Sequence, residues 1–289
     1  MVFDAVALAR QQSRLMRAAT PPWLHGEVAR RMAERLPVIR LQPQQVADWG
    51  AFLGGSGALL HKAYPKARVL AVEAAAVVAD PPRWWLPKRW LSAPGPTPVS
   101  AAELPAGQSQ LVWANMALHW VADPQALMRQ WQRALAVDGF LMFSTLGPGS
   151  LALLRGLYAA QAWPPPFAPF VDMHDLGDML VEAGFADPVM DQEQLTLTWP
   201  SADALLAELR GLGGNTHPQR HAGLRTPRWQ QRLQRALQSH ADAQGRIALV
   251  FELVYGHAFK PLPRPRVTAR TTLPLDDLRA MVRASRKPG

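Results

Sequence analysis

The chain has 289 residues, no cysteine and a formal net charge of +9. This length is sufficient for one large hydrophobic core, and the absence of cysteine excludes disulfides and thiolate metal sites. The sequence contains no run of about 18 apolar residues, and its N-terminus lacks the pattern of a secretory signal. We therefore expect a protein with no membrane span that works in the cytoplasm.

The charge is unevenly distributed along the chain. Residues 1–214 contain 17 Lys and Arg against 18 Asp and Glu, whereas residues 215–289 contain 14 against 4. Clustered positive charge accelerates encounters with an acidic partner, and salt weakens that effect. The last quarter of the chain is thus either a surface for an acidic partner or a solvated basic tail.

The first half of the chain predicts a helical start and then a strand–helix–strand unit. Residues 1–40 have helical spacing, with Leu24, Val28 and Met32 four residues apart after a Pro-Pro entry. A short apolar strand over 44–50 leads into a glycine loop and a helix, and a second strand ends at Glu73. In such a unit the helix N-terminus faces a ligand at the carboxyl edge of a parallel sheet.

The middle of the chain continues this alternation after an irregular insertion. Residues 80–98 are rich in Pro and Trp, and their tryptophans predict either a partner- or membrane-contacting patch or the cover of a core edge. The following pattern predicts a helix capped by Asp123 and a helix closed by Gly184. Strands are expected over 111–115, 139–147 and 191–200.

The last third predicts two helices, one strand and a tail. A helix over 201–212 runs into a Gly-Gly turn, and Thr226-Pro227 begins a second helix. A strand is expected over 248–260. The fold class is therefore α/β, a doubly wound, mostly parallel sheet with an antiparallel edge strand and helical insertions. We expect an N-terminal helical segment over residues 1–40 and a central domain over 41–260, with insertions near 80–98 and 200–240. A basic Pro-rich tail follows over 261–289.

The glycine loop, DWGAFLGGSG at residues 48–57, suggests a ligand without phosphate. Its glycine spacing does not match a dinucleotide fingerprint, and no Gly-Lys-Ser or Gly-Lys-Thr follows, which excludes a P-loop. Asp48 and Glu73 end consecutive strands, so their carboxylates can lie side by side. One carboxylate can accept both hydroxyls of a ribose, and a glycine loop can lie close to an amino-acid moiety. S-adenosylmethionine contains both a ribose and an amino-acid moiety, and it has no phosphate.

A longer segment shows a family resemblance. LVWANMALHWVADPQALMRQWQRALAVDGFLMFSTLGPGSL resembles the region from the fourth to the fifth strand of class I S-adenosylmethionine-dependent methyltransferases. More narrowly, it resembles the BioC family, the malonyl-acyl-carrier-protein O-methyltransferases of biotin synthesis. EVARRMAERL, FVDMHDLGDMLVEAGFADPVMD and LLAELRGLGGNTH share this resemblance, which covers most of residues 20–260.

The resemblance implies a cofactor, a reaction and a partner. It implies that S-adenosylmethionine is bound by Asp48, Gly50, Gly54, Gly55, Gly57, Glu73, Ser100 and Asn115. The acceptor would be a malonyl carboxylate, which is already ionised and needs neither a general base nor a metal. It needs a donor or a bidentate arginine to orient it; the substrate candidates are His119, Trp120, Asn215, His217, Arg225 and Arg228. An acidic acyl carrier protein would dock on the basic last quarter, with Arg228, Arg232 and Arg235 as the predicted surface.

The sequence departs from the family pattern at three positions, and this leaves alternatives open. The glycine loop is longer than usual, Ser100 stands where an Asp is expected before Leu104-Pro105, and only Trp23 could replace a usual N-terminal aromatic residue. One alternative is a non-catalytic or repurposed relative, and another is a class I enzyme acting on another small molecule or protein. Nucleic acid ranks last, because Asn115 is not followed by the Pro-Pro-Tyr of base-amino methyltransferases.

Overall fold

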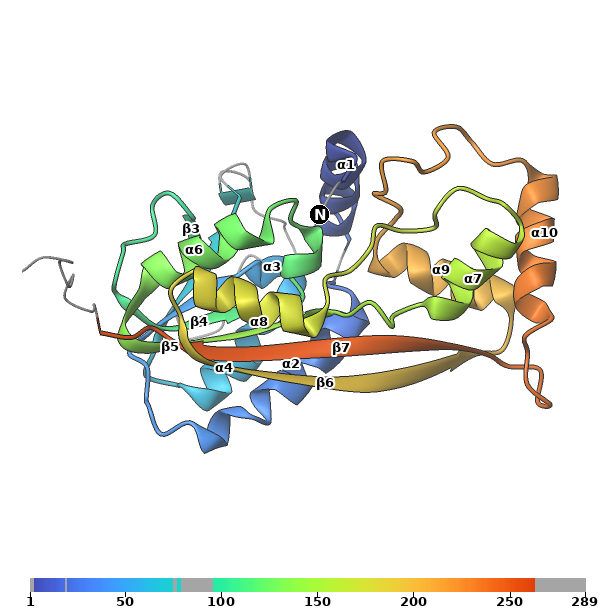
Figure 1. The fold of residues 1–289 in the computed structure, drawn as a ribbon. Coiled ribbons are helices and arrows are strands. Elements are labelled where there is room, and N and C mark those ends of the chain that lie inside the picture. The colour runs from blue at the N-terminus through green and yellow to red at the C-terminus, as the bar shows by residue number, and fades with distance from the viewer. Residues whose placement is uncertain (1–2, 19, 75–76, 79–95, 263–289) are drawn as a thin grey trace, which may run out of the picture.

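The computed structural model describes residues 3–18, 20–74, 77–78 and 96–262. These residues form a seven-stranded sheet with helices on both faces (Figure 1). The strands are β1 (Gln45–Trp49), β2 (Arg68–Glu73), β3 (Thr97–Ser100), β4 (Ser109–Ala114), β5 (Leu135–Leu146), β6 (Ala186–Trp199) and β7 (Ile247–Phe259). The helices are α1 (Ala5–Met16), α2 (Trp23–Ala33), α3 (Ala51–Gly54), α4 (Gly57–Ala63), α6 (Pro124–Ala134), α7 (Ala152–Ala160), α8 (Met173–Glu182), α9 (Ala202–Leu212) and α10 (Pro227–Gln238), with 3-10 turns η1 (Leu36–Val38) and η2 (Leu118–Trp120).

The strand order confirms a doubly wound sheet. The order is β3-β2-β1-β4-β5-β7-β6, and the pairs among β1 to β5 are parallel. Strand β7 is antiparallel to both of its neighbours, β5 and β6, so the expected antiparallel strand lies one position inside the edge. The chain changes winding direction between β1 and β4, and ligands of such sheets bind at the carboxyl ends of the strands at this point.

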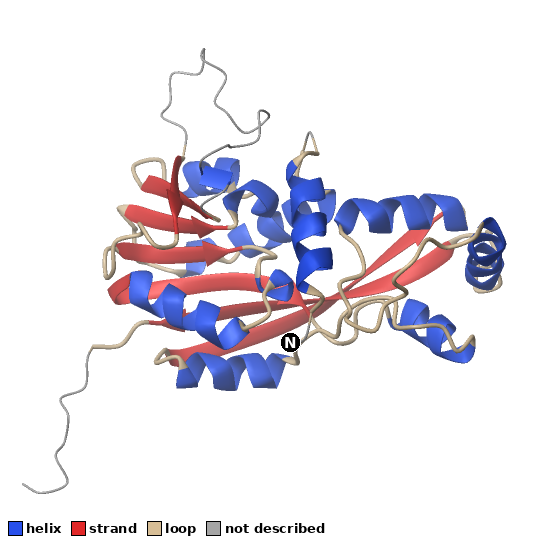
Figure 2. Ribbon diagram, turned by 90° about the horizontal axis from the view of Figure 1, so that it is seen from above, coloured by secondary structure: helices blue, strands red, loops and turns tan. Residues whose placement is uncertain are grey.

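Two apolar clusters hold the helices against the sheet, whose strands Figure 2 shows side by side. On one face, Leu24, Val28 and Met32 of α2 pack with Leu60 of α4 and with alternate residues of the strands. On the other face, α6 and α8 pack through a second cluster that includes Trp131 and Leu180. Burial of both faces explains why β1 and β4 are apolar without a polar alternation.

The β6–β7 ribbon continues beyond the rest of the sheet. β5 pairs with β7 only as far as Leu146 opposite Leu253, whereas β6 pairs with β7 to Trp199 opposite Ile247. The extension carries a group of three helices, α7, α9 and α10, which lies beside the carboxyl ends of the strands (Figure 1). We call these three helices the helical cap.

Local sequence signals explain most helix starts. Asp123 accepts a hydrogen bond from the Ala126 amide, and Thr226 accepts one from the Trp229 amide, which confirms both predicted starts. Gly184 has φ 91° after α8, as a helix-closing glycine requires. None of the helices among the described residues is long and apolar enough to span a bilayer.

The structure also differs from the sequence-based expectation. Helix α7 was not predicted, and β3 begins at Thr97, within the residues assigned to the insertion. The glycine loop contains a helical turn, α3, where an open loop was expected. Most of the Trp-rich insertion, including Trp84, Trp85 and Trp90, and the tail beyond residue 262 lie outside the described residues.

Candidate active site at the carboxyl ends of the strands

The glycine loop is a compact turn bounded by two left-handed glycines. Gly50 has φ 70° and Gly55 has φ 67°, which side-chain-bearing residues rarely adopt. The Gly50 amide donates to the Val72 carbonyl at 2.9 Å, which fixes the loop to β2. Between the two glycines, Phe52 is fully buried. Gly57 begins α4 with open space around its α-carbon, so packing does not require a glycine there.

Two acidic side chains lie together at the ends of β1 and β2. Asp48 is 1% exposed, and no described residue donates a hydrogen bond to either of its carboxylate oxygens. Burial, and then the neighbouring charge of Glu73, raise the pKa of Asp48 well above its usual value. Burial raises the pKa of Glu73 to about 7, against the lowering effect of the Phe52 amide, which donates to its Oε1 at 2.8 Å.

This carboxylate pair fits the cofactor that the loop suggested. A buried carboxylate without a donor is costly, and a ligand ammonium group supplies both the charge and the hydrogen bonds that Asp48 lacks. Glu73 is oriented by the loop at the next strand end, where a carboxylate can accept from sugar hydroxyls. The amino-acid and ribose portions of S-adenosylmethionine carry these two kinds of group.

Asn115 and Ser100, the other predicted cofactor residues, bond within the protein. The Asn115 amide group donates to the carbonyls of His25 at 2.7 Å and Gly54 at 2.6 Å, and its oxygen accepts from Ser144 at 2.7 Å. It thereby joins α2, the glycine loop and β5. Ser100 lies opposite Glu73 in the β2–β3 pairing, and its hydroxyl donates to Glu103 at 2.7 Å.

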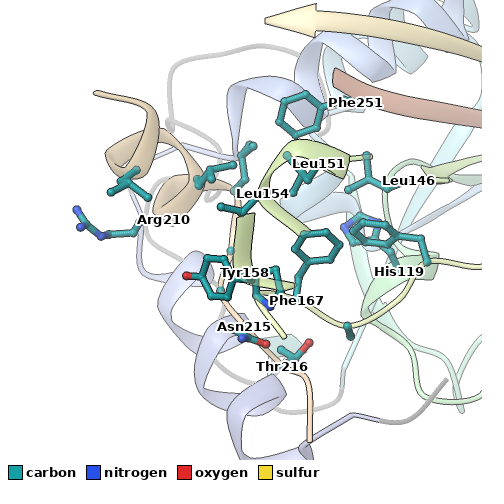
Figure 3. A pocket seen from close by; sticks show the side chains of 18 of the residues that line it. His119, Leu146, Leu151, Leu154, Tyr158, Phe167, Arg210, Asn215, Thr216 and Phe251 are labelled. Atoms are coloured by element: carbon teal, nitrogen blue, oxygen red, sulfur yellow. The ribbon is translucent and has the colours of Figure 1, made fainter. Parts of the chain in front are cut away.

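A cavity of about 400 Å³ opens between the strand ends and the helical cap (Figure 3). Most of its wall is apolar and comes from β5, the cap helices and β7, including Leu146, Leu151, Leu154, Leu206, Leu209, Leu212, Leu233 and Phe251. The polar side chains of Tyr158, Asn215 and Thr216 also line it (Figure 3). In Figure 3, His119 and Arg210 lie at opposite ends of the cavity.

The inner end of the cavity contains two buried histidines and a tryptophan. The rings of His25 and His119 lie edge to face with centroids 6.0 Å apart, and His119 lies 5.1 Å from Trp120. Burial lowers the pKa of His25 to about 4 and that of His119 well below its usual value, so both are neutral at pH 7. Neither Nδ1 of His119 nor Nε1 of Trp120 has a partner among the described residues, although both atoms are buried.

His25 connects this inner end to the glycine loop. Its Nδ1 lies 2.9 Å from the Leu53 carbonyl, which can only accept, so the proton resides on Nδ1. The other nitrogen, Nε2, is then an acceptor. The same side chain lines the cavity, so His25 connects the glycine loop to the cavity wall.

The outer end is cationic and aromatic. The Arg225 guanidinium lies 4.3 Å from the centroid of the Trp229 ring. Burial raises the pKa of Tyr158, and the positive charge of Arg225 lowers it in part. Arg210, Gly214 and Gln230 are the exposed part of the wall and mark the mouth, between α9 and α10.

Four of the six predicted substrate residues meet in this cavity: His119, Trp120, Asn215 and Arg225. The Asn215 amide donates to the Pro165 carbonyl at 2.6 Å and holds the loop before α8. His217 lines a neighbouring cavity of about 280 Å³, and Arg228 is exposed outside both. Sequence reasoning missed His25 and Tyr158. His25 could have been found, because it falls on the apolar face of the helix that carries Leu24 and Val28.

Comparisons with known proteins agree with this architecture. The profile of a methyltransferase domain matches residues 27–187. The malonyl-acyl-carrier-protein O-methyltransferase of Laribacter hongkongensis is 37% identical over 252 residues, which cover 84% of each chain. The chain is a member of this methyltransferase family. The enzyme of the same name from Gallionella capsiferriformans is 39% identical over 249 residues, covering 83% of this chain and 85% of its own.

Solved structures support the fold of this family member. The YcgJ protein from Bacillus subtilis is 13% identical and covers 83% of this chain and 100% of its own, with a TM-score of 0.54. At that identity the likeness concerns the fold alone. The predictions of a methyltransferase of the BioC kind and of a doubly wound sheet are thereby confirmed.

Proposed function

We propose that the protein transfers a methyl group from S-adenosylmethionine to the free carboxylate of a malonyl thioester on acyl carrier protein. The observation that carries this proposal is the neutral, buried inner end of the cavity beside the glycine loop. The curated relatives named as malonyl-acyl-carrier-protein O-methyltransferases support the choice of acceptor.

Asp48 and Glu73 are the residues that hold the cofactor in this proposal. When bound, S-adenosylmethionine supplies an electrophilic methyl group on a positively charged sulfur. Asp48 would accept hydrogen bonds from its ammonium group, and Glu73 would accept from its ribose hydroxyls. Gly50 and Gly55 allow the backbone turn that brings α3 and its neighbouring amides to this edge of the sheet.

The histidine and tryptophan N–H groups at the inner end orient the acceptor carboxylate. Trp120 Nε1 donates one hydrogen bond, and His119 donates a second in the tautomer with its proton on Nδ1. Both donors are uncharged. Because methyl transfer from a bound sulfonium to this carboxylate would neutralise both charges, the dry, uncharged pocket that these residues form would favour the transfer.

This placement changes the role expected for arginine. Arg225 was a candidate for a bidentate contact to the carboxylate, but it stacks on Trp229 near Tyr158. A guanidinium at the reacting carboxylate would stabilise the anion and reduce its reactivity. We assign Arg225 to the entering thioester arm, where a fixed cation can bind the phosphate that links such an arm to its carrier.

The cavity size agrees with a substrate larger than malonate. Pockets of about 300–1,000 Å³ bind ligands of drug-like size, and malonate fills only a small part of this one. The apolar middle suits the carbon chain of the thioester arm. A carrier protein at the mouth would leave its malonyl group at the inner end.

Methyl-ester formation tests the proposal. The protein would be incubated with S-adenosylmethionine and malonyl-carrier protein, and intact mass spectrometry would report the gain of one methylene. A carrier protein loaded with the terminal amide of malonate is the matched control, since it lacks the nucleophilic carboxylate. We expect methylation of the acid only. Cofactor binding by calorimetry without transfer would indicate a repurposed relative, and methylation of free small acids alone would indicate a different acceptor.

A further inference from the structure

A row of four arginines runs from the cavity mouth along α10. Arg225 directly precedes the Thr226 cap, and Arg228, Arg232 and Arg235 follow within α10 at a spacing of four and three residues, which places these three on one side of the helix. Leu233 and Leu237 are buried on the other side. The three helical members span about 10 Å, since a helix rises about 1.5 Å per residue. The first member of the row, Arg225, also lines the cavity.

The charge of this row is not neutralised within the described part of the chain. No Asp or Glu among the described residues forms an ion pair with any of the four arginines. Arg232 instead bonds the Gln161 amide oxygen at 3.0 Å and lies over Trp163, and Arg235 donates to the Gln231 carbonyl at 3.4 Å.

Helix α2 gives an internal comparison. It and the turn after it also carry arginines, and these are all paired with carboxylates. Arg31 lies 2.8 Å from Glu27, and Arg35 lies 2.7 Å from Asp191. The arginines of α2 therefore pair within the protein and stabilise the fold, whereas the positive charges of α10 remain available to attract an external partner.

An exposed leucine lies beside the row. Leu224 is 97% exposed and directly precedes Arg225. Its aliphatic side chain has no role in the core of the protein. An apolar residue bordered by cations next to a cavity mouth is the composition of a protein contact, and it does not suit a phosphate backbone.

We propose that Leu224, Arg228 and Arg235 dock the acyl carrier protein, with an acidic helix of the carrier lying along α10. The inference rests on the proposed function for the identity of the partner. In this arrangement the carrier places its thioester arm at Arg225 and into the cavity. Arg228, Arg232 and Arg235 pair with carboxylates on about two turns of the partner helix, which sets the register and accelerates encounter.

Binding of the unloaded carrier protein tests docking without methyl transfer. Isotope-labelled holo-carrier protein would be titrated with the full-length protein at low salt and followed by NMR. The variants are R228E/R235E and L224S, which leave the contacts of Arg232 unchanged. The control is R129E, a charge reversal on the exposed face of α6, which lies at the other end of the molecule from α10 (Figure 1). Circular dichroism would confirm that each variant is folded.

We expect R228E/R235E to weaken carrier binding about tenfold or more and L224S to weaken it severalfold, with no change in R129E. KM for malonyl-carrier protein would rise in parallel, while turnover of malonyl-pantetheine would be unchanged. Carrier binding by R228E/R235E equal to wild type would overturn the inference, as would binding of RNA but not of carrier protein by wild type. If wild type binds the carrier on this surface but methylates no malonyl thioester, the proposed function fails and the docking surface stands.

Discussion

Replacing Glu73 by glutamine should stabilise the protein at alkaline pH and weaken cofactor binding. Glu73 ends β2 beside Asp48, and burial raises its pKa to about 7. The folded state therefore binds a proton between about pH 4.5 and 7 that the unfolded state releases. Stability falls as pH rises through this window, and the full penalty is present above pH 7. Glutamine removes that penalty and can still accept from the Phe52 amide.

The size of the effect follows from the pKa. A rise from 4.5 to about 7 corresponds to ~3 kcal/mol against the ionised form. Glu73 is partly exposed, so solvent screening reduces this to about 2 kcal/mol. For a chain of this size, that is an increase in the melting temperature of about 4–8 °C. Loss of the charged acceptor should weaken S-adenosylmethionine binding by about 10- to 100-fold.

Thermal unfolding of the cofactor-free protein at pH 8 and pH 4.5 measures the first effect, and calorimetry measures the second. Glu103 of the neighbouring strand end supplies the control, because its pKa is lowered by the Ser100 amide. We expect E103Q to show no gain at pH 8. A lower melting temperature for E73Q at pH 8, or the same gain at both pH values, would refute the reasoning.

Three other substitutions probe the framework and the acceptor site. N115A removes three buried hydrogen bonds, to the His25 and Gly54 carbonyls and from the Ser144 hydroxyl, so we expect a loss of about 3 kcal/mol and a melting temperature lower by about 6–10 °C; an unchanged melting temperature with lost cofactor binding would instead place Asn115 at the cofactor. W120F removes the indole donor and should lower kcat/KM for malonyl-carrier protein about tenfold, with calorimetric cofactor affinity unchanged; full activity would remove Trp120 from the site. G213A places a methyl group against the Trp120 ring and should reduce the same kcat/KM in steady-state assays, whereas G211A, which meets open space, should not.

The family and the acidic pair at the edge of the sheet were accessible from the sequence because their signals are local. Asp48 and Glu73 follow short apolar strands, and parallel strands bring their carboxyl ends to one edge of the sheet. Thr226 and Asp123 cap their helices through bonds to residues only three positions away. Such short-range contacts depend little on the rest of the fold.

The tertiary structure alone decided what these residues do. From the sequence, Asn115 is expected to contact a ligand after β4. In the structure its amide group donates to carbonyls of α2 and the glycine loop, which are far away in the sequence. The neutral state of His119 arises from burial among α2, η2 and Phe170, which no pattern near residue 119 reveals. Likewise, the sequence shows that Glu27 and Glu34 stand at pairing distance from the arginines of α2, but only the folded chain shows that Glu193 and Asp191 of β6 also reach Arg31 and Arg35. The sequence by itself determined the alternation of strands and helices along most of the chain and the acidic pair at the ends of two strands; long-range packing determined the burial, the charge state and the hydrogen-bond partners of these side chains.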